Sequence, residues 1–379
     1  MTHAQAPRTR RHRTPFPATT PGDRLALASR IGAPRVPPTT HEPELTHPVD
    51  LCTMDGRLAP EARGWSRTPL HRCNLGGPWG RRKRWDYWAV TNRGGQVLAI
   101  TYADLDYLGL VTVAFLDIGT QRWTEHALAI PGALGFRQPD TVGGADIQFA
   151  LPSLALSIIE SPEGTRLRTR FRNIAGRKLE ADVLVTRPAG HETLSVVIPW
   201  SESRFQFTSK HNSRPAVGHV TLDGDVHRFD ASNEGFGCLD YGRGLWPYRT
   251  VWNWAAASGR VGERVVGLQF GGKWTDGTGC TENALCIDGR LTKIGEDLEF
   301  AYDVTDYRRP WTIRAKRSGL VELRFEPAYE KVLDIQLGAG AAQAHVCFGH
   351  FSGRVVTESG ETIEIAHLFG WAEEMRARW

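Results

Sequence analysis

Long apolar runs are missing from this sequence, and no stretch approaches the roughly 18 residues that a membrane-spanning helix needs. Neither the six cysteines nor the 13 histidines show zinc-ligand spacing, and no CxxC, GxSxG or HExxH motif is present. We therefore expect no integral membrane segment, no metal and no cofactor. Cys280 and Cys286 permit a bridge across a tight turn, but reduced, buried thiols in a cytoplasmic protein are the simpler interpretation.

Excess charge is confined to the N-terminus. Residues 1–48 contain seven arginines and three acidic residues, which accounts for the net charge of +4, and 39 basic and 39 acidic residues remain in the rest. Proteins that bind nucleic acids gather basic side chains on the folded surface. The nearest candidate here is the basic run at residues 81–84, which is short and typical of a solvated loop. The sequence predicts no nucleic-acid partner.

The first 48 residues also hold nine of the 22 prolines. Such a segment buries too little apolar surface to offset the entropy of ordering it, so we predict a disordered tail over 1–48, with one helical turn possible at 25–29. A tandem arginine at Arg10 and Arg11 is typical of some export signals. Prolines and charges follow it in place of an apolar core, so we expect the protein to stay in the cytoplasm.

Helix signals are scarce as well. Helical spacing is found only over residues 365–378, where a glycine weakens it. By contrast, residues 95–118 are dense in β-branched and aromatic side chains, which favour strands. Residues 147–159 and 166–172 read as two strands of a hairpin around the turn at 161–164.

Two Asp-Gly pairs, at 223–224 and 288–289, each lie between short alternating runs. An Asp-Gly pair supplies the positive φ angles of a two-residue hairpin turn, so both predict hairpins. Residues 320–326 alternate apolar and charged side chains, which predicts one buried and one wet face. The fold class is therefore all-β with very little helix: two antiparallel barrel or sandwich units, residues 49–205 and 206–379, with the main motifs in the second.

A candidate site comes from the segment 240–254, which combines three tryptophans and two tyrosines with one acid, two arginines and an amide. Small-molecule sites have aromatic walls and a few converging polar groups. The alternative is a core strand whose indole N–H groups bond to local acceptors. The glycine-rich segment 271–283 has no phosphate-loop order, but Glu282 there is a carboxylate whose pKa an apolar pocket would raise.

These segments give our predicted site. Asp240 and Glu282 are the acid and base, and Tyr248 and Arg243 orient the substrate or stabilise developing charge. His211, His345 and His350 are interpreted as structural or rim residues. The predicted catalytic set is Asp240, Glu282 and Tyr248, and the predicted substrate-binding set is Arg243, Trp246, Trp252, Asn253, Trp254, Trp274 and Asp276.

Several motifs carry a family resemblance. They lie in the segments 64–70 (GWSRTPL), 83–88 (KRWDYW), 103–107 (ADLDY), 240–254, 271–283 and 369–374 (FGWAEE). Together they resemble the bacterial family catalogued as domain of unknown function 2804, over about residues 50–379. More remotely, the chain is similar to two-barrel lipocalin-like proteins that include carotenoid hydratases and Diels–Alderases. That likeness implies an apolar, isoprenoid-like substrate held between two β units and no cofactor.

Three functions remain open at this point. The first is a cofactor-independent enzyme that hydrates, isomerises or cyclises an apolar or lipid-like molecule by acid/base chemistry. The second is a carrier or sensor of such a ligand, whose carboxylates would all be paired to arginines, as Asp240 would be to Arg243. The third is a carbohydrate-active enzyme that uses two of Asp240, Asp276 and Glu282. The oligomeric state cannot be inferred from the sequence.

Overall fold

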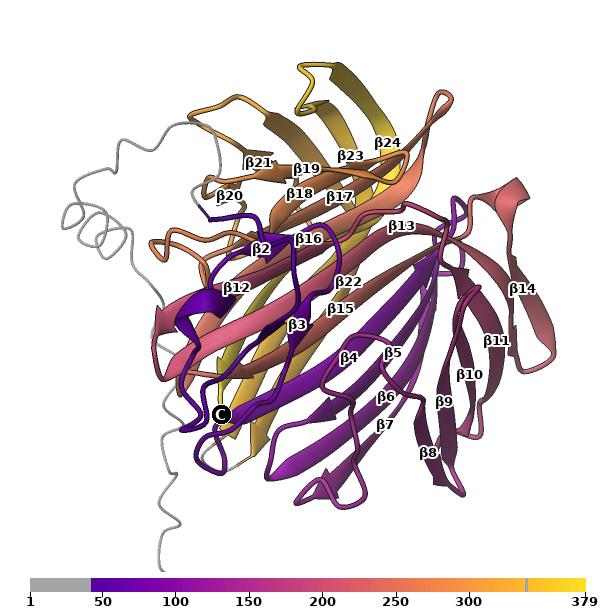
Figure 1. Cartoon of the computed structure of the whole chain (residues 1–379). Helices are drawn as coiled ribbons and strands as arrows, with labels where there is room; N and C mark the ends of the chain where they lie inside the picture. Colours follow the sequence, from indigo (N-terminus) through magenta and orange to yellow (C-terminus); the bar gives the residue numbers. More distant parts are fainter. Residues whose placement is uncertain (1–41, 338–339) are drawn as a thin grey trace, which may run out of the picture. The chain divides into compact units, whose positions relative to one another are not determined.

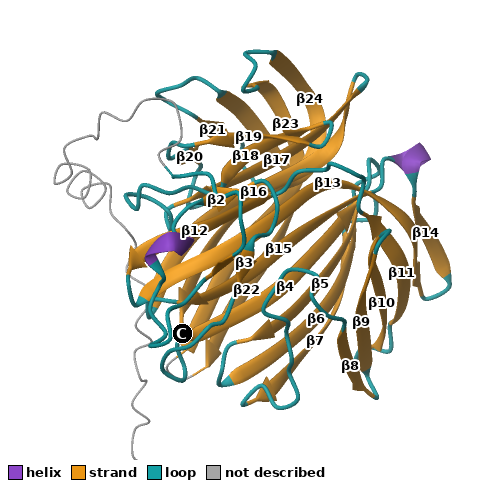
Figure 2. Ribbon diagram, in the orientation of Figure 1, coloured by secondary structure: helices purple, strands orange, loops and turns teal. Residues whose placement is uncertain are grey.

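β-Strands form nearly all the regular structure of the chain (Figure 2). The structure is a computed structural model and describes residues 42–337 and 340–379. Within these ranges the only helices are two single turns, η1 (Pro60–Ala62) and η2 (Ala231–Asn233). No helix in the described part of the chain is long and apolar enough to cross a membrane. The predicted fold, all-β with very little helix, is confirmed.

The first sheet has thirteen strands, all paired antiparallel. Its main path runs through β7 (Arg122–Pro131), β6 (Leu108–Asp117), β5 (Gln96–Asp104), β4 (Arg82–Thr91), β15 (Phe236–Leu245), β13 (Arg204–Leu222), β11 (Lys178–Thr186), β10 (Gly164–Arg172), β9 (Leu154–Ser161) and β8 (Ile147–Leu151). Off this path are β12 (Leu194–Ser201) and β14 (Asp225–Phe229), which pair with β13, and β2 (Trp65–Ser66), which pairs with β12. The long strand β13 thus joins both halves of the sheet.

The second sheet has nine antiparallel strands, coloured orange to yellow in Figure 1. They follow the order β19 (Arg290–Ile294), β18 (Asn283–Ile287), β17 (Arg264–Gly272), β16 (Arg249–Val261), β24 (Thr362–Arg378), β23 (Gly340–Val356), β22 (Val321–Leu337), β21 (Trp311–Arg314) and β20 (Glu299–Ala301). A separate parallel pair joins β1 (Val49–Asp50) to β3 (His71–Arg72). The fold is therefore two antiparallel β units, as predicted.

Turn chemistry determines several of these hairpins. Asp223 and Gly224 connect β13 to β14 with φ angles of 54° and 103°, and Asp288 and Gly289 connect β18 to β19 with 50° and 79°. The hairpin around 161–164 also forms, between β9 and β10. All three predicted turns are confirmed.

Two predicted elements are wrong in detail. The expected strand 147–159 is two strands, because the chain reverses at Pro152 and Ser153 between β8 and β9. The weak helical spacing over 365–378 belongs to a strand, β24, which pairs with both β16 and β23. Tertiary pairing along both edges overrides the local helical preference there.

Each sheet carries an apolar core on one face. The first core packs on the first sheet and the segment before β4, with Phe205, Phe207 and Tyr241 among its buried members, and another core lies on the second sheet. Two further apolar clusters combine residues of both sheets, for example Cys238 of β15 with Trp254 of β16. The opposite faces of β13 and β15 therefore meet the second sheet, and this contact layer positions the candidate site.

The change from the first to the second sheet comes between Leu245 and Arg249, so three strands of the expected second unit, β13, β14 and β15, belong to the first sheet. The described residues form one compact unit, and the predicted division at 205/206 stays a prediction. Of the predicted tail, residues 42–48 are ordered: Glu42 is buried and lies 3.0 Å from Lys293 Nζ. Composition alone did not show this ion pair. The expected turn at 25–29 lies outside the described residues.

Close strand packing makes Gly370 of β24 sensitive to substitution. A Cβ atom there would lie 2.2 Å from the Ala256 carbonyl oxygen of β16, which is fixed in the sheet. We expect Gly370→Ala to lower the unfolding free energy by about 1–3 kcal/mol in urea titrations, because overpacking displaces backbone. The control is Gly119→Ala on an exposed turn, where we expect a change within about 0.5 kcal/mol. Equal stabilities of the two variants would contradict the close packing.

Candidate functional site

A row of three polar side chains crosses the first sheet on the face that meets the second. Lys210 of β13 is opposite Asp240 of β15, which is opposite Tyr87 of β4. Residues in register on neighbouring strands project from the same face of a sheet. Lys210 Nζ lies 2.9 Å from Asp240 Oδ1, and the Thr208 hydroxyl donates to the same oxygen at 3.1 Å.

Glu282 reaches this row from the second sheet, just before β18. Its Oε2 lies 3.1 Å from Lys210 Nζ, and its Oε1 accepts a hydrogen bond from Trp274 Nε1 at 2.8 Å. Only glycine fits beside it at 271, where a Cβ atom would lie 2.0 Å from Glu282 Oε1. Lys210 and Glu282 are almost fully buried. One buried ammonium therefore serves two carboxylates.

Burial acts to lower the pKa of Lys210, but Asp240 and Glu282 outweigh it, so the pKa is raised and the ammonium stays charged. Burial raises the pKa of Glu282. Lys210 opposes that rise, while the charge of Asp240 adds to it. The three groups together carry one net negative charge when both carboxyls are ionised.

The second sheet presents a matching row. Trp254 of β16 is opposite Glu373 of β24. Lys210 Nζ lies 4.4 Å from the centroid of the Trp254 ring, and the Tyr87 ring lies 5.7 Å from it, edge to face. The two rows therefore face each other across the layer between the sheets. We call Lys210, Asp240, Glu282 and Glu373 the Lys210 cluster.

Glu373 has a different environment from the other carboxylates. Burial raises its pKa to about 7, although a hydrogen bond from Trp252 Nε1 at 2.9 Å and the charge of Lys210 act to lower it. The negative charges of Asp240 and Glu282 add to the rise. Glu373, Trp252 and Asp240 are only partly buried. A carboxyl group that is half protonated near neutral pH is suited to proton transfer.

Tryptophans wall the cluster, with Trp246 at the centre. Its ring stacks on Trp274 at 5.6 Å and lies 5.9 Å from Trp252. The Trp246 indole donates to Gln206 at 2.6 Å and the Trp254 indole donates to Gln269 at 3.0 Å. The indoles of Trp246 and Trp254 are therefore satisfied by local acceptors, as expected for core tryptophans. The indoles of Trp252 and Trp274 instead donate to carboxylates of the cluster.

The structure brings together six of the ten predicted residues and places four elsewhere. Those at or beside the Lys210 cluster are Asp240, Glu282, Trp246, Trp252, Trp254 and Trp274. Of the others, Tyr248 is 45% exposed at a turn, and Asp276 lies on an exposed turn where it accepts from the Lys273 backbone. Asn253 bonds to Tyr302 on the other face of β16.

Arg243 is the fourth, and it does not pair with Asp240. Its guanidinium lies 2.9 Å from Asp86 Oδ2 and 3.6 Å from the Tyr241 ring centroid. Positions 240 and 243 are an odd number of residues apart on one strand, so their side chains project from opposite faces. The carrier hypothesis expected arginines beside the carboxylates. Asp240 and Glu282 instead pair with a lysine.

Three members of the two rows were missed from the sequence: Lys210, Tyr87 and Glu373. Tyr87 and Glu373 lie within the segments 83–88 and 369–374, whose motifs were used for the family resemblance. That signal was available for these two residues. Lys210 has no comparable signal, because its role depends on strand pairing with β15 and on contact with the second sheet.

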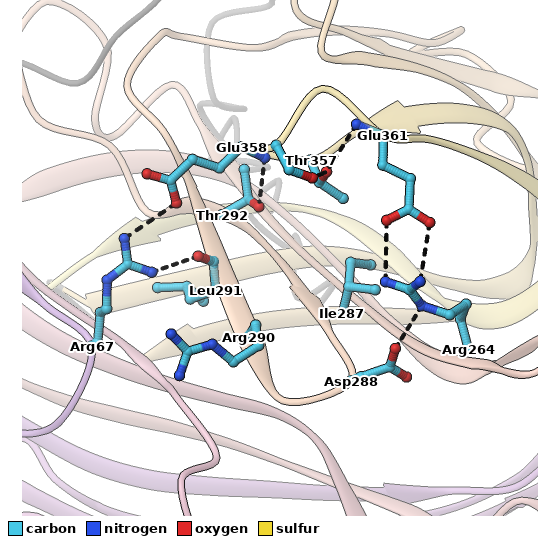
Figure 3. Close-up of a pocket in the computed structure, with 11 residues that line it drawn as sticks. Arg67, Arg264, Ile287, Asp288, Arg290, Leu291, Thr292, Thr357, Glu358 and Glu361 are labelled. Carbon is cyan, nitrogen blue, oxygen red and sulfur yellow. Dashed lines mark hydrogen bonds and ion pairs between the residues drawn. The ribbon is translucent and has the colours of Figure 1, made fainter.

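An open pocket of about 670 Å³ lies elsewhere, beside the β18–β19 and β23–β24 hairpins (Figure 3). Its arginines are already bound. Arg67 donates to the Leu291 carbonyl at 2.6 Å and lies 3.4 Å from Glu358, while Arg264 lies 3.1 Å from Glu361. None of the ten predicted residues lines it. Its polar groups hold the hairpins together.

Within residues 42–337 and 340–379, no group of three or more His, Cys, Asp or Glu side chains is arranged to hold a metal ion. All six cysteines are free thiols, and only Cys280 is not buried.

A family model described as "Domain of unknown function (DUF2804)" matches residues 42–379. The chain belongs to this family. No curated protein sequence matches it. Similar solved structures include a putative AttH from Nitrosomonas europaea, with 14% identity and a TM-score of 0.47 over 78% of this chain and 92% of that one. Kievitone hydratase from Nectria haematococca has 11% identity and a TM-score of 0.42. The protein CghA has 12% identity and a TM-score of 0.37. Each of these two matches covers 78% of this chain and 88% of the other chain. None of these matches carries an activity over to this chain.

The hydrogen bond from Trp252 gives a direct test of the Glu373 environment. In Trp252→Phe the carboxylate loses its indole donor, so we expect the pKa of Glu373 to rise by roughly half a unit to one unit. The measurement is a carbon-13 NMR titration of glutamate side chains, with Glu373→Gln to assign the signal. The control is Trp200→Phe, because the Trp200 indole donates to the Trp274 carbonyl. An unchanged or lower pKa in Trp252→Phe would contradict the contact.

Proposed function

We propose that this protein is an enzyme that transfers protons on an apolar or amphipathic, isoprenoid- or lipid-like small molecule through its own side chains, without a cofactor. Hydration, isomerisation and cyclisation are the reaction types that such chemistry serves. The observation that carries the proposal is the Lys210 cluster: a carboxyl group with a pKa of about 7, Glu373, near an ionised pair and beside tryptophan rings.

The roles follow from the electrostatics. Glu373 in its protonated form donates a proton to an unsaturated carbon or a carbonyl oxygen of the substrate. Asp240, ionised beside Lys210, accepts a proton from water or from a substrate carbon. Lys210 stays charged because two carboxylates surround it, and Glu282 in its ionised form gives the three groups one net negative charge. In a hydration, the water oxygen would bond to the second carbon and its proton would pass to Asp240.

The substrate class is inferred from the walls. Trp252, Trp254 and Tyr87 present aromatic faces and edges to the layer between the sheets, and such surfaces bind apolar molecules. The net negative charge of the cluster and the aromatic faces would both stabilise positive charge that develops on a protonated alkene.

The carbohydrate alternative has less support. Asp276 lies on an exposed turn and accepts from the Lys273 backbone, which leaves Asp240 and Glu282 as the carboxylate pair. Both lie within about 3 Å of the same lysine nitrogen. The two paired oxygens therefore lie at most about 6 Å apart, short of the roughly 6.5–9.5 Å of inverting glycosidases. The roughly 5–5.5 Å of retaining glycosidases stays within reach, but the ammonium occupies the space between the two groups.

The decisive experiment combines ligand capture with solvent isotope exchange. Freshly purified protein is analysed by native mass spectrometry and solvent extraction, and is then incubated in D2O with a panel of isoprenoids, unsaturated lipids and oligosaccharides. We expect an apolar ligand at one per chain and a product that gains carbon-bound deuterium. Binding without deuterium incorporation would establish a carrier, and selective capture of an oligosaccharide would favour the carbohydrate function.

A further inference from the structure

Arg214 stands apart among the buried cations. In the described part of the chain five cationic side chains of lysine and arginine are buried: Lys83, Lys210, Arg214, Arg243 and Lys293, of which Lys293 lies 3.0 Å from Glu42. Lys210 and Arg243 each lie 2.9 Å from a carboxylate oxygen, and Lys83 donates to two backbone carbonyls at 3.0 Å. Arg214 is 4% exposed and its Nε has no partner. Among the described residues, no hydrogen bond or ion pair reaches its guanidinium.

Such a group demands an explanation, because charged side chains are almost never buried unless they are paired. Burial lowers the pKa of Arg214 to about 10, and the positive charge of Arg187 contributes to that decrease. The group nonetheless stays charged at neutral pH. An unpaired buried cation destabilises the folded protein, so its presence points to a partner that is not part of this chain.

A bulge in β13 sets the position of Arg214. The pairing of β13 with β15 shifts between His211 and Arg214, and Ser213 has a φ angle of 50°. The second sheet holds the bulge in place, since the Asn212 side chain donates to the Leu268 carbonyl at 2.5 Å. Bulges re-aim the side chains that follow them. Arg214 and Ala216 lie two residues apart on β13, so their side chains project from the same face of the strand. Ala216 belongs to the first core, so Arg214 lies on that face, opposite to Lys210.

The surroundings of Arg214 are electropositive. The charge of Glu160 acts on Arg214, but this carboxylate is already paired with Arg187 at 2.7 Å. Burial lowers the pKa of His211 well below its usual value, and the charges of Arg214 and Arg187 add to that decrease, so the imidazole is neutral. One monoanion would balance the remaining positive charge.

His211 supplies a second unused polar atom. Its Nε2 lies 3.1 Å from the Ser209 hydroxyl, while its buried Nδ1 has no partner. When the hydroxyl donates to Nε2, the imidazole proton sits on Nδ1 and is available to an acceptor.

We propose that Arg214, with Arg187 and His211, forms a binding site for the carboxylate or phosphate group of a small anionic ligand. The planar guanidinium matches both groups through two parallel hydrogen bonds. The site is separate from the Lys210 cluster, because the two lie on opposite faces of β13. It therefore holds whether or not the protein is an acid/base enzyme.

The test measures anion-dependent stability of the full chain. Thermal unfolding is followed in sodium phosphate, sodium butyrate and sodium chloride at equal ionic strength, and affinities are obtained by calorimetry. We expect phosphate or butyrate, but not chloride, to raise the Tm of the wild type by roughly 2 °C or more at saturation. A response to butyrate alone would identify a carboxylate ligand, and a response to phosphate alone would identify a phosphorylated one.

Substitution of Arg214 separates a binding role from a structural one. In Arg214→Met we expect the anion response to disappear, with a Tm in chloride equal to or above that of the wild type, because an unpaired buried charge is removed. Arg170→Met, on an exposed position of β10, should respond as the wild type does. If Arg214→Met does not fold, Arg214→Lys is decisive: we expect it to bind at least tenfold more weakly.

Three results would overturn the proposal. The first is a wild type that responds to phosphate and butyrate only as it does to chloride. The second is an Arg214→Met variant that keeps the full anion response. The third is an Arg214→Lys variant with unchanged affinity.

Discussion

We expect Lys210→Met to lower the free energy of unfolding by about 3–5 kcal/mol near pH 8, measured by urea denaturation. The substitution leaves Asp240 and Glu282 without their shared cation, and an uncompensated buried charge is strongly destabilising. The matched control is Lys316→Met. Lys316 lies 2.6 Å from Glu299 on the surface, where an ion pair contributes within about 1 kcal/mol.

A triple variant identifies the cause of that loss. Lys210→Met combined with Asp240→Asn and Glu282→Gln removes all three charges, and replacing a buried ion cluster by neutral groups is often close to neutral for stability. We therefore expect the triple variant to recover most of the lost free energy. A triple variant no more stable than Lys210→Met would show that the lysine acts through packing and not through charge.

The second large effect concerns Glu373. Once the deuterium assay has identified a substrate, we expect Glu373→Gln to lower its turnover roughly 100- to 10,000-fold, the range found for loss of a general acid or base. The amide keeps the shape and still accepts from Trp252, so ligand affinity should change little. Glu364→Gln, an exposed position on the same strand, is the control and should retain full activity. Full turnover by Glu373→Gln would rule out this residue as the acid.

The same variant should be more stable than the wild type at alkaline pH. The pKa of Glu373 is raised from 4.5 to about 7 in the folded protein, so between these values the folded state binds more protons than the unfolded state. Wild-type stability therefore falls as the pH rises through that window, by up to about 3 kcal/mol. Glu373→Gln lacks this loss. We expect equal stabilities near pH 4.5 and a more stable variant at pH 8, and identical pH profiles would contradict the shift.

Local chemistry was enough to predict much of the fold. Asp223-Gly224 and Asp288-Gly289 define their turns through their own φ preferences, and the alternation over 320–326 matches a strand with Val321, Leu323 and Phe325 buried. Alternation does not reveal which strands pair across long separations in sequence. The pairing of β4 with β15, which puts Tyr87 beside Asp240, joins residues about 150 positions apart.

The site was predicted in part for the same reason. The tryptophans and two of the carboxylates stand out by composition, so Asp240, Glu282 and Trp252 were found. Composition does not distinguish the two faces of a strand, and Arg243 and Asn253 were included although their side chains project from the opposite faces of β15 and β16. Lys210 and Glu373 depend on contact between two sheets, which no local pattern encodes.

The order of the strands has a consequence for synthesis in the cell. Only Trp246, Pro247 and Tyr248 connect β15 to β16, so every strand of the first sheet leaves the ribosome before any strand of the second. During that interval Lys210 and Asp240 face water, together with the apolar side chains of Ala89 and Cys238. The nascent chain therefore exposes a partly apolar sheet face to which a chaperone can bind. Lys210 and Asp240 lose their contact with water only in the last step of folding, when the second sheet packs against the first.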